Sequence, residues 1–198
     1  MYNKIRMKLS VFRNFFMFAA IFLVIAGCAS STVRYINPDA NFSYIRKVAV
    51  LPFNNLTSDR YAGEKIRSIV TVDILSRGAF EVLEQGEVSK TLGAVLRAAG
   101  ASEGMVLDPD KETLKLLGEK LGAQAVIIGS VDEYEGASGG AVVSISMRML
   151  DASSGIILWQ ANSTASGKSV WRRILGIEEV DRTVLTRKAV GKAIDTLL

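Results

Sequence analysis

Few side chains in this 198-residue chain could carry out chemistry, because it has no histidine and only one cysteine, Cys28. Without an imidazole there is no Ser-His-Asp or Cys-His nucleophile system and no histidine metal site. A single thiol also excludes a disulfide framework and a Cys-x-x-Cys redox pair. The remaining candidates are acidic residues and one polar segment that ends in Gly-Lys-Ser.

Two groups of acidic residues have the types needed for a catalytic or metal site. Glu133 and Glu135 lie two apart on an expected strand, so their carboxylates share a face and could act as a pair in glycan cleavage. Asp108, Asp110 and Glu112 lack the glycine and the distal glutamate of a recognisable calcium loop. Like charges on an exposed strand face are usually just solvated. We therefore expect no catalytic residue, no metal and no cofactor here.

Residues 162–169 approach the pattern of a phosphate-binding P-loop. They follow an expected strand and end in Gly167-Lys168-Ser169, but Asn162 stands where the first glycine belongs. An exported domain also has no supply of ATP. We therefore expect a polar strand end and a turn.

The first 27 residues have the organisation of a secretory signal peptide. They contain no acid, and four bases precede or begin the apolar run Phe15–Ala26: Lys4, Arg6, Lys8 and Arg13. A run of that size is shorter than the ~20 residues that a membrane-spanning helix needs. The alternative is an N-terminal membrane anchor or a buried helix.

The end of this run, Ile25-Ala26-Gly27-Cys28, resembles the bacterial lipobox. The resemblance implies cleavage after Gly27 and a covalent diacylglycerol and N-acyl lipid on Cys28. Several acyl chains hold a protein stably on a membrane, since each buried methylene adds ~0.8 kcal/mol. Ala29, rather than an aspartate, follows the cysteine, which by the usual sorting pattern indicates the periplasmic side of the outer membrane.

The charge of the chain is concentrated in the signal segment. When its four bases are subtracted from the 24 Lys and Arg, 20 bases remain against 20 acids. Because binding to nucleic acid depends on neutralising phosphates, a neutral domain is not expected to bind it.

The mature chain predicts one α/β domain with a mixed sheet behind a short tether. Residues 28–44 are polar, with Asn37-Pro38-Asp39 as a breaker, and predict a flexible lipidated tether. Residues 45–198 predict the order β-α-β-α-α-β-β-β-α from their apolar runs and periodicity. The expected strands are 48–51, 80–84, 125–129, 143–149 and 156–163, and the expected helices are 62–76, 88–96, 108–121 and 178–198.

Several segments of this domain carry a family resemblance. VAVLPFNNLTSD (48–59) resembles the first strand of the curli-secretion lipoprotein CsgG and of the TolB amino-terminal domain. FEVLEQGEVSKTL, LGEKLGAQAVIIGSVDEYEG and VVSISMRMLDASSGIILWQANS follow in the same order. The same fold is used by LpoB, the lipoprotein activator of a bifunctional peptidoglycan synthase. The resemblance covers about residues 45–169 and implies a TolB-N/CsgG-like fold and an envelope protein that works by contact.

The long hairpins that form the CsgG channel have no counterpart here. Each would need about twenty alternating residues, because a spanning strand has ~9–11. Residues 135–140 are only a turn, and residues 160–173 carry Lys168, Arg172 and Arg173 without sustained apolar alternation. We therefore expect the family domain without the pore.

Two segments are candidates for contact with a partner. Asn54, Asn55 and Thr57 lie in the loop after the first predicted strand, and loops on a rigid scaffold often carry recognition. Trp171-Arg172-Arg173 has the composition of an interface anchor or of a contact at the level of lipid headgroups. The alternative for this second segment is a tryptophan that caps the edge of the core beside solvated arginines.

These observations favour a non-enzymatic outer-membrane lipoprotein, an adaptor or assembly factor in cell-envelope biogenesis similar to a peptidoglycan-synthase activator. Its expected partners are the membrane, through the lipid anchor, and an envelope protein: a peptidoglycan synthase or a secretion component. One alternative is a homo-oligomeric subunit of a CsgG-like ring in a secretion or surface-organelle apparatus. Another is an enzyme that acts on glycan or peptide through Glu133 or Glu135.

Overall fold

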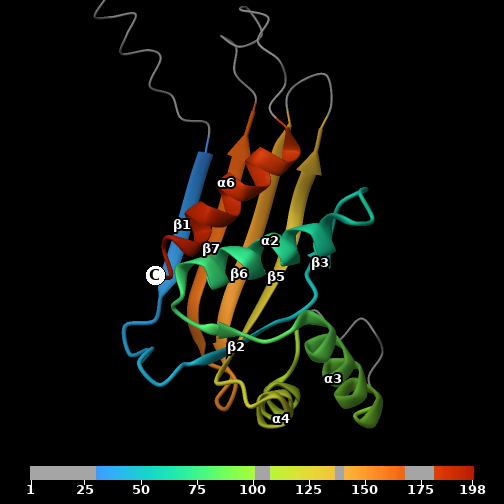
Figure 1. Cartoon of the computed structure of the whole chain (residues 1–198), viewed down its shortest axis with the longest axis vertical. Coiled ribbons are helices and arrows are strands. Elements are labelled where there is room, and N and C mark those ends of the chain that lie inside the picture. Colours follow the sequence, from blue (N-terminus) through green and yellow to red (C-terminus); the bar gives the residue numbers. More distant parts are fainter. Residues whose placement is uncertain (1–29, 101–107, 137–140, 168–180) are drawn as a thin grey trace, which may run out of the picture.

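A mixed seven-stranded sheet forms the centre of the molecule (Figure 1). The computed structural model describes residues 30–100, 108–136, 141–167 and 181–198. The strands run in the order β1-β7-β6-β5-β2-β4, and β3 also pairs with β5. The elements in chain order are β1 (Ser30–Ile36), β2 (Lys47–Val50), β3 (Asn54–Asn55), α2 (Ala62–Arg77), β4 (Glu81–Val82), α3 (Gln85–Ala98), α4 (Lys111–Leu121), β5 (Ala125–Glu135), β6 (Val142–Asp151), β7 (Ile157–Ser166) and α6 (Arg182–Ile194).

The prediction of a single α/β domain with a mixed sheet is confirmed. β2 runs parallel to β4 and β5, whereas β5, β6, β7 and β1 pair antiparallel. From β2 onward the order is the predicted one, apart from the two-residue β3. β2 could be recognised because Val48, Ala49 and Val50 are buried on both faces of the sheet.

The two faces of the sheet are covered differently. The side chain of Ile127 belongs to the core cluster under α2 and α6, while those of Val126 and Ile128 pack with α3 and α4 on the other face. α3 and α4 lie at one end of the sheet (Figure 1). Beyond them this face is polar and no helix of the described residues covers it, so we call it the helix-free face. It carries Ser144, Ser146, Asn162 and Thr164.

Local signals set the ends of the helices. Ile66, Val70 and Ile74 of α2 are fully buried, and the helix stops at Gly78, whose φ of 66° is the left-handed conformation that glycine adopts most readily. Asp110 caps α4 by accepting a 2.8 Å hydrogen bond from the Thr113 backbone N–H. The closing helix, predicted over 178–198, is shorter because Asp181 caps it before Arg182.

The prediction of a flexible tether over residues 28–44 is wrong for its central part. Ser30–Ile36 form β1, which pairs antiparallel with β7 over its whole length. The Thr32 and Ser163 hydroxyls also form a hydrogen bond of 3.1 Å across this pair. The strand could not be predicted from its own sequence, because its pairing depends on a distant strand. Its first residues, Ser30-Ser31-Thr32, are polar and are typical of a linker. The folded domain therefore begins at or before Ser30 rather than at Ile45.

Four strands have an end at the same end of the sheet. β1 starts there, where Ser30 pairs with Ala165 near the end of β7; β6 starts there, where Val142 pairs with Ser166 of β7 and with Glu135 at the end of β5. α6 begins at the same end (Figure 1). We call it the Ser30 end of the sheet, and α4 lies at the opposite end.

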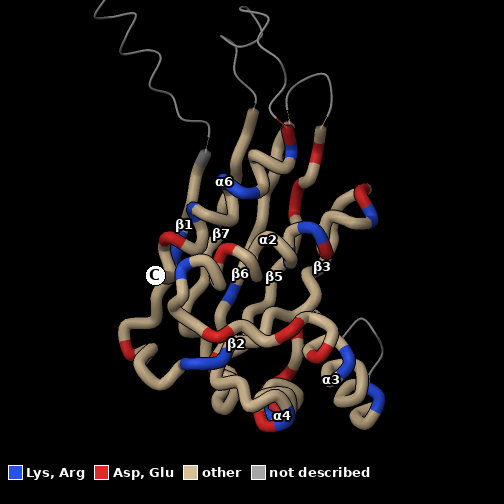
Figure 2. Tube along the Cα trace, viewed as in Figure 1, with Lys and Arg blue, Asp and Glu red and all other residues tan. Residues whose placement is uncertain are grey.

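Charges of both signs are interspersed along the trace (Figure 2). Arg77, for example, binds Asp73 at 2.9 Å and Asp195 at 2.6 Å, which joins α2 to the end of α6. Among the described residues, no helix combines the length and the apolar character needed to cross a membrane.

Candidate recognition loop

The loop between β2 and α2 is built on the sheet rather than beside it. In β3, Asn54 pairs with Ser130 and Asn55 with Val131 of β5. The Leu56 backbone N–H extends this pairing with a 3.0 Å hydrogen bond to the Val131 carbonyl oxygen. The loop therefore starts from a fixed backbone position.

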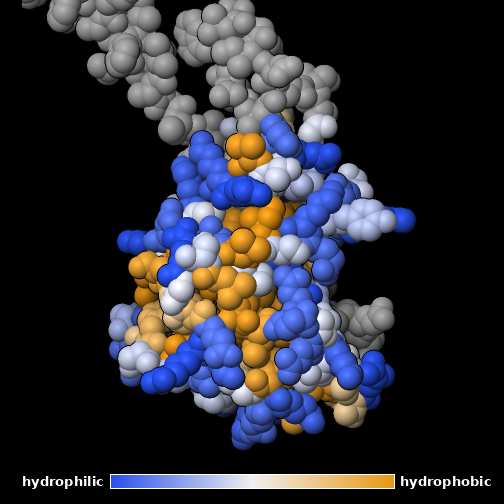
Figure 3. Space-filling model, viewed as in Figure 1, coloured by the Kyte–Doolittle hydropathy of each residue, from blue (hydrophilic) through white to orange (hydrophobic). Residues whose placement is uncertain are grey.

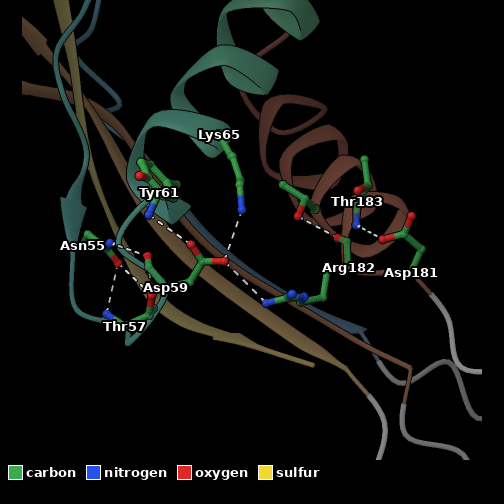
Figure 4. A network of polar contacts seen from close by, with 9 residues as sticks. Asn55, Thr57, Asp59, Tyr61, Lys65, Asp181, Arg182 and Thr183 are labelled. Carbon is green, nitrogen blue, oxygen red and sulfur yellow. Dashed lines mark hydrogen bonds and ion pairs between the residues drawn. The ribbon is translucent and has the colours of Figure 1, made fainter. Parts of the chain in front are cut away.

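The Asn55 side chain closes the loop on itself (Figure 4). Its Oδ1 accepts hydrogen bonds from the Thr57 backbone N–H at 3.1 Å and from the Thr57 hydroxyl at 2.8 Å. Its Nδ2 donates to the Asp59 carbonyl oxygen at 2.7 Å. Such asparagine turns hold a loop in a single conformation.

Asp59 joins the loop to two helices, and its carboxylate lies between Lys65 and Arg182 (Figure 4). Oδ1 accepts from the Tyr61 backbone N–H at 3.0 Å, while Oδ2 lies 3.1 Å from Lys65 Nζ and 3.5 Å from Arg182 Nη1. The hydrogen bond from Tyr61, followed by the one from Lys65, holds the pKa of Asp59 below its usual value.

Tyr134 of β5 completes this anchor. The Lys65 ammonium lies 5.6 Å and the Arg182 guanidinium 5.2 Å from the centre of its ring, within the range of a cation–π interaction. Tyr134 itself is buried. The loop is thus fastened to β5, α2 and α6 at once.

This framework leaves two large apolar side chains in solvent: Leu56 is 63% and Tyr61 is 61% exposed. Arg60 is exposed beside Tyr61. Tyrosine and arginine are enriched among the residues that dominate binding energy at protein interfaces. These three exposed side chains of one anchored loop are of types suited to binding a protein, and we call them the loop triad.

The structure assigns different roles to the predicted contact residues. Asn55 and Thr57 bond within the loop and shape it, and Asn54 lines a small cavity of about 280 Å³ with Ser130 and Ser146. Sequence reasoning missed Leu56 and Tyr61. The available signal was the presence of an apolar and an aromatic residue in a loop otherwise made of Asn, Ser, Thr and Asp.

The other predicted site residues lie outside the described residues. They are Ile25, Ala26, Gly27 and Cys28 of the lipobox, and Trp171, Arg172 and Arg173.

The acidic candidates lie in solvent or take part in other contacts. Glu133 and Glu135 are both exposed, and they pair across the sheet with Ser144 and Val142 of β6. Asp108 binds Arg148 at 3.1 Å, whereas Asp110 is used as a helix cap. No group of three potential metal ligands is found in the described part of the chain.

The P-loop alternative for residues 162–169 also fails. Residues 162–166 are part of β7 and pair with both β6 and β1, so they cannot wrap around a phosphate group.

A second exposed apolar surface lies on α2. Val72 is 64% exposed and lines a groove of about 370 Å³ with Ile69, Asp73 and Arg187. Apolar side chains are gathered on the face that α2 and α6 cover (Figure 3). This surface is similar to the loop triad in exposure, and Asp73, which lines it, is bound by Arg77 of the same helix.

A protein-family model described as peptidoglycan-synthase activator LpoB matches residues 29–165. The chain belongs to the LpoB family. The match covers more than half of the chain and begins one residue before β1, so the strand that was predicted as a tether is part of the LpoB-family domain. The family is thus that of a regulatory activator in the cell envelope.

Solved structures share the fold of this LpoB-family chain. The PelC dodecamer from Paraburkholderia phytofirmans is 20% identical with a TM-score of 0.56, over 83% of this chain and 95% of that one. Lipoprotein GNA1162 from Neisseria meningitidis is 20% identical with a TM-score of 0.53, over 77% and 98%. The hypothetical protein CT253 from Chlamydia trachomatis is 13% identical with a TM-score of 0.52, over 77% and 95%.

The resemblance to CsgG is not supported by these matches, which favour LpoB among the families that the sequence resembles. No curated protein sequence matches the chain.

Proposed function

We propose that this protein is an outer-membrane lipoprotein that activates a peptidoglycan synthase by direct contact, without catalysing a reaction. The observation that carries the proposal is the match of residues 29–165 to the LpoB activator family. The absence of histidine from the sequence and the use of Asp108 in an ion pair and of Asp110 as a helix cap are consistent with a role in binding.

The lipobox supplies the attachment to the membrane, and β1 limits the freedom of the domain. Cys28 lies two residues before Ser30, a span of at most about 7 Å in extended chain. A diacylglyceryl group on Cys28 therefore holds the Ser30 end of the sheet against the bilayer. α4, at the other end, then points into the periplasm.

The loop triad is the surface that we assign to the synthase. Leu56 and Tyr61 supply apolar area and Arg60 a charge, while Asn55 and Asp59 fix the loop before binding. A preorganised loop binds more tightly because little conformational entropy remains to be lost.

The test compares Leu56→Asp with Val72→Asp. The two side chains are almost equally exposed, but Leu56 lies in the loop and Val72 lies on α2. Purified lipoprotein is added to the peptidoglycan synthase of the same bacterium, and glycan polymerisation is measured. We expect Leu56→Asp to reduce the stimulation at least tenfold and Val72→Asp to leave it within about threefold. Wild-type protein that does not stimulate the synthase would refute the activator role. Loss with Val72→Asp alone would move the contact to α2.

A ring-forming subunit is a second candidate, favoured by the similarity of fold to PelC, which is described as a dodecamer. Light scattering of the lipidated protein in mild detergent, with the detergent mass subtracted, separates the two. A monomer or dimer supports the adaptor, and a closed oligomer of many subunits supports the ring.

A further inference from the structure

β1 is the edge strand of the sheet, and one side of its backbone is unpaired. The Asn37 backbone N–H donates to the Leu158 carbonyl oxygen, which continues the register of Ile36 with Trp159. Along a strand of an antiparallel ladder, the backbone N–H and C=O groups of successive residues point alternately toward the partner strand and away from it. The backbone groups of Val33 and Tyr35 therefore face β7, and those of Thr32, Arg34 and Ile36 point away from it. No backbone hydrogen bond reaches that side from the described residues.

This edge lacks the usual protection against strand addition. Proteins blunt exposed edges with short strands, prolines, bulges or charges. β1 has seven residues, contains no proline, pairs with β7 without a register shift and carries only one charge, Arg34. The opposite edge is protected, because β4 has only two residues and Glu81 is paired with Lys47 at 3.3 Å.

The side chains of β1 are as open as its backbone. Val33 is 71% and Tyr35 is 50% exposed on the helix-free face, and Ile36 is 42% exposed on the α6 face. A strand added beside β1 would cover apolar area on both faces and satisfy three backbone N–H and three C=O groups. Main-chain pairing gives such an interface its affinity and alternate side chains its specificity.

A second copy of the chain does not fit this edge in an antiparallel pair when both copies are anchored. Antiparallel pairing of two β1 strands would place the two Ser30 residues at opposite ends of a ladder about 20 Å long. Each Cys28 lies only two residues before Ser30, so the two lipids could not enter the same bilayer surface. Because two-fold pairing of edge strands is ordinarily antiparallel, this geometry favours a strand from another protein as the occupant.

We propose that β1 binds an extended segment of the peptidoglycan synthase as an additional strand of the sheet. The segment places apolar side chains against Val33 and Tyr35 and a carboxylate beside Arg34. This inference rests on the proposed function, adds a second contact to the loop triad, and identifies the backbone of β1 as the recognition element.

The matched variants are Arg34→Pro and Arg34→Thr. Both remove the charge, but only proline removes the outward N–H, and edge strands tolerate proline at such a position. Binding of each variant to the purified periplasmic region of the synthase is measured by calorimetry, with thermal unfolding as the control for folding. We expect Arg34→Pro to weaken binding at least tenfold and Arg34→Thr to weaken it no more than about threefold.

Amide hydrogen exchange of the wild-type protein provides a measurement that does not depend on the variants. The amides of Thr32, Arg34 and Ile36 should exchange fast in the isolated protein and be protected in the complex. Protection in the isolated monomer, or only together with a doubled mass, would overturn the proposal, because the edge would then be covered by the chain itself or by a second copy. Wild-type binding that Arg34→Pro leaves intact, with these amides unprotected, would refute the edge contact alone. A synthase that does not bind wild-type protein would refute this contact and the proposed function together.

Discussion

The hydroxyl of Tyr44 donates a hydrogen bond to Oδ2 of Asp151 and thereby ties the segment before β2 to the end of β6. Asp151 also organises the following turn: its Oδ1 accepts from the Ser153 and Ser154 backbone N–H groups at 3.0 and 2.6 Å. Burial by itself would raise the pKa of Asp151, but the hydrogen bonds from Ser153, Tyr44 and Ser154 outweigh it and lower the pKa to about 2.

The Asp151 carboxylate should make the domain sensitive to acid. Its folded pKa of about 2 lies below the ordinary 3.8, so its stabilisation is complete above pH 4 and is lost as the pH falls toward 2. We expect a loss of about 1–2 kcal/mol in the free energy of unfolding across this window. Urea denaturation of the lipid-free protein between pH 7 and pH 2.5 measures it.

Asp151→Asn should be less stable than wild type at pH 7 and should show less of this acid dependence. Asp39→Asn, at an exposed position, is the matched control and should follow the wild-type profile. Equal acid dependence in all three proteins would show that Asp151 does not carry the effect.

The hydroxyl of Tyr44, the partner of Asp151, predicts a corresponding loss of stability at alkaline pH. Burial, followed by the hydrogen bond to Asp151 and the charge of Asp151, raises the pKa of Tyr44 to about 12. Because the folded pKa lies above the ordinary 10, this stabilisation is present below pH 10 and is lost as the pH rises toward 12. Tyr44→Phe should remove this alkaline dependence in the same denaturation experiment, and an unchanged profile in Tyr44→Phe would assign it to other groups.

The buried guanidinium of Arg67 should be essential for stability. It is 2% exposed and has no acidic partner among the described ion pairs. Nε and Nη2 donate to the Val50 carbonyl oxygen at 3.0 and 2.8 Å, Nη2 also donates to the Gln85 carbonyl oxygen at 3.2 Å, and Nη1 donates to the Ser89 hydroxyl at 3.0 Å. Burial lowers the pKa of Arg67 below its ordinary value.

Lysine at position 67 keeps the charge but cannot form this forked set of bonds. Arg67→Lys should therefore lower the free energy of unfolding by about 2–3 kcal/mol. Arg77→Lys, which changes two partly exposed ion pairs, should cost about 1 kcal/mol or less. Similar losses for both variants in urea denaturation would contradict the role given to burial.

Much of this fold is predictable because its apolar pattern is local. The buried positions Val88, Leu92, Val95 and Leu96 of α3 repeat at helical spacing, and the glycines after α2 and α4 mark where these helices end. β1 lacks such a signal. Its strand conformation depends on β7, and the Thr32–Ser163 contact joins residues 131 positions apart.

The contacts of the candidate site are likewise of two kinds, those local in the sequence and those between distant elements. The bonds of Asn55 to Thr57 join residues two positions apart, and Asn and Thr side chains often bond to nearby backbone, so a shaped loop could be expected. The ion pair of Asp59 with Arg182 and the contact of the Arg182 guanidinium with the Tyr134 ring depend on how α6 packs across the sheet. No local sequence pattern specifies these contacts. They distinguish the residues that hold the loop from the loop triad, whose side chains remain exposed.

Two glycines should respond to alanine in opposite directions. A Cβ at Gly129 would overlap Phe53 Cε1 and lie 2.7 Å from the Ser146 carbonyl oxygen. Gly129→Ala should cost about 2–3 kcal/mol through overpacking. At Gly93 in α3 the nearest atom is the flexible Arg97 Nη1 at 3.3 Å, so Gly93→Ala should gain up to about 1 kcal/mol of helix propensity. Thermal unfolding measures both, and stabilisation by Gly129→Ala would contradict the packing described around Phe53.

The short distance from Cys28 to β1 predicts a fixed orientation of the domain on the membrane. Because Cys28 is the only cysteine of the chain, a cysteine introduced elsewhere is the only free thiol once Cys28 is acylated. Thr183→Cys places a fluorophore at the start of α6, near the Ser30 end, and Lys115→Cys places one on α4; both positions are exposed. β6 separates the two ends by about 30 Å.

Energy transfer to an acceptor dye in the bilayer should therefore be clearly stronger from position 183 than from position 115. A flexible insert of twenty Gly and Ser residues between Ala29 and Ser30 has an average span of about 25 Å and should largely abolish the difference. Cys28→Ser should release the protein from the membrane and remove transfer from both positions. Equal transfer from both positions in the lipidated protein without the insert would mean that β1 does not hold the domain in the proposed orientation, even though the anchor is present.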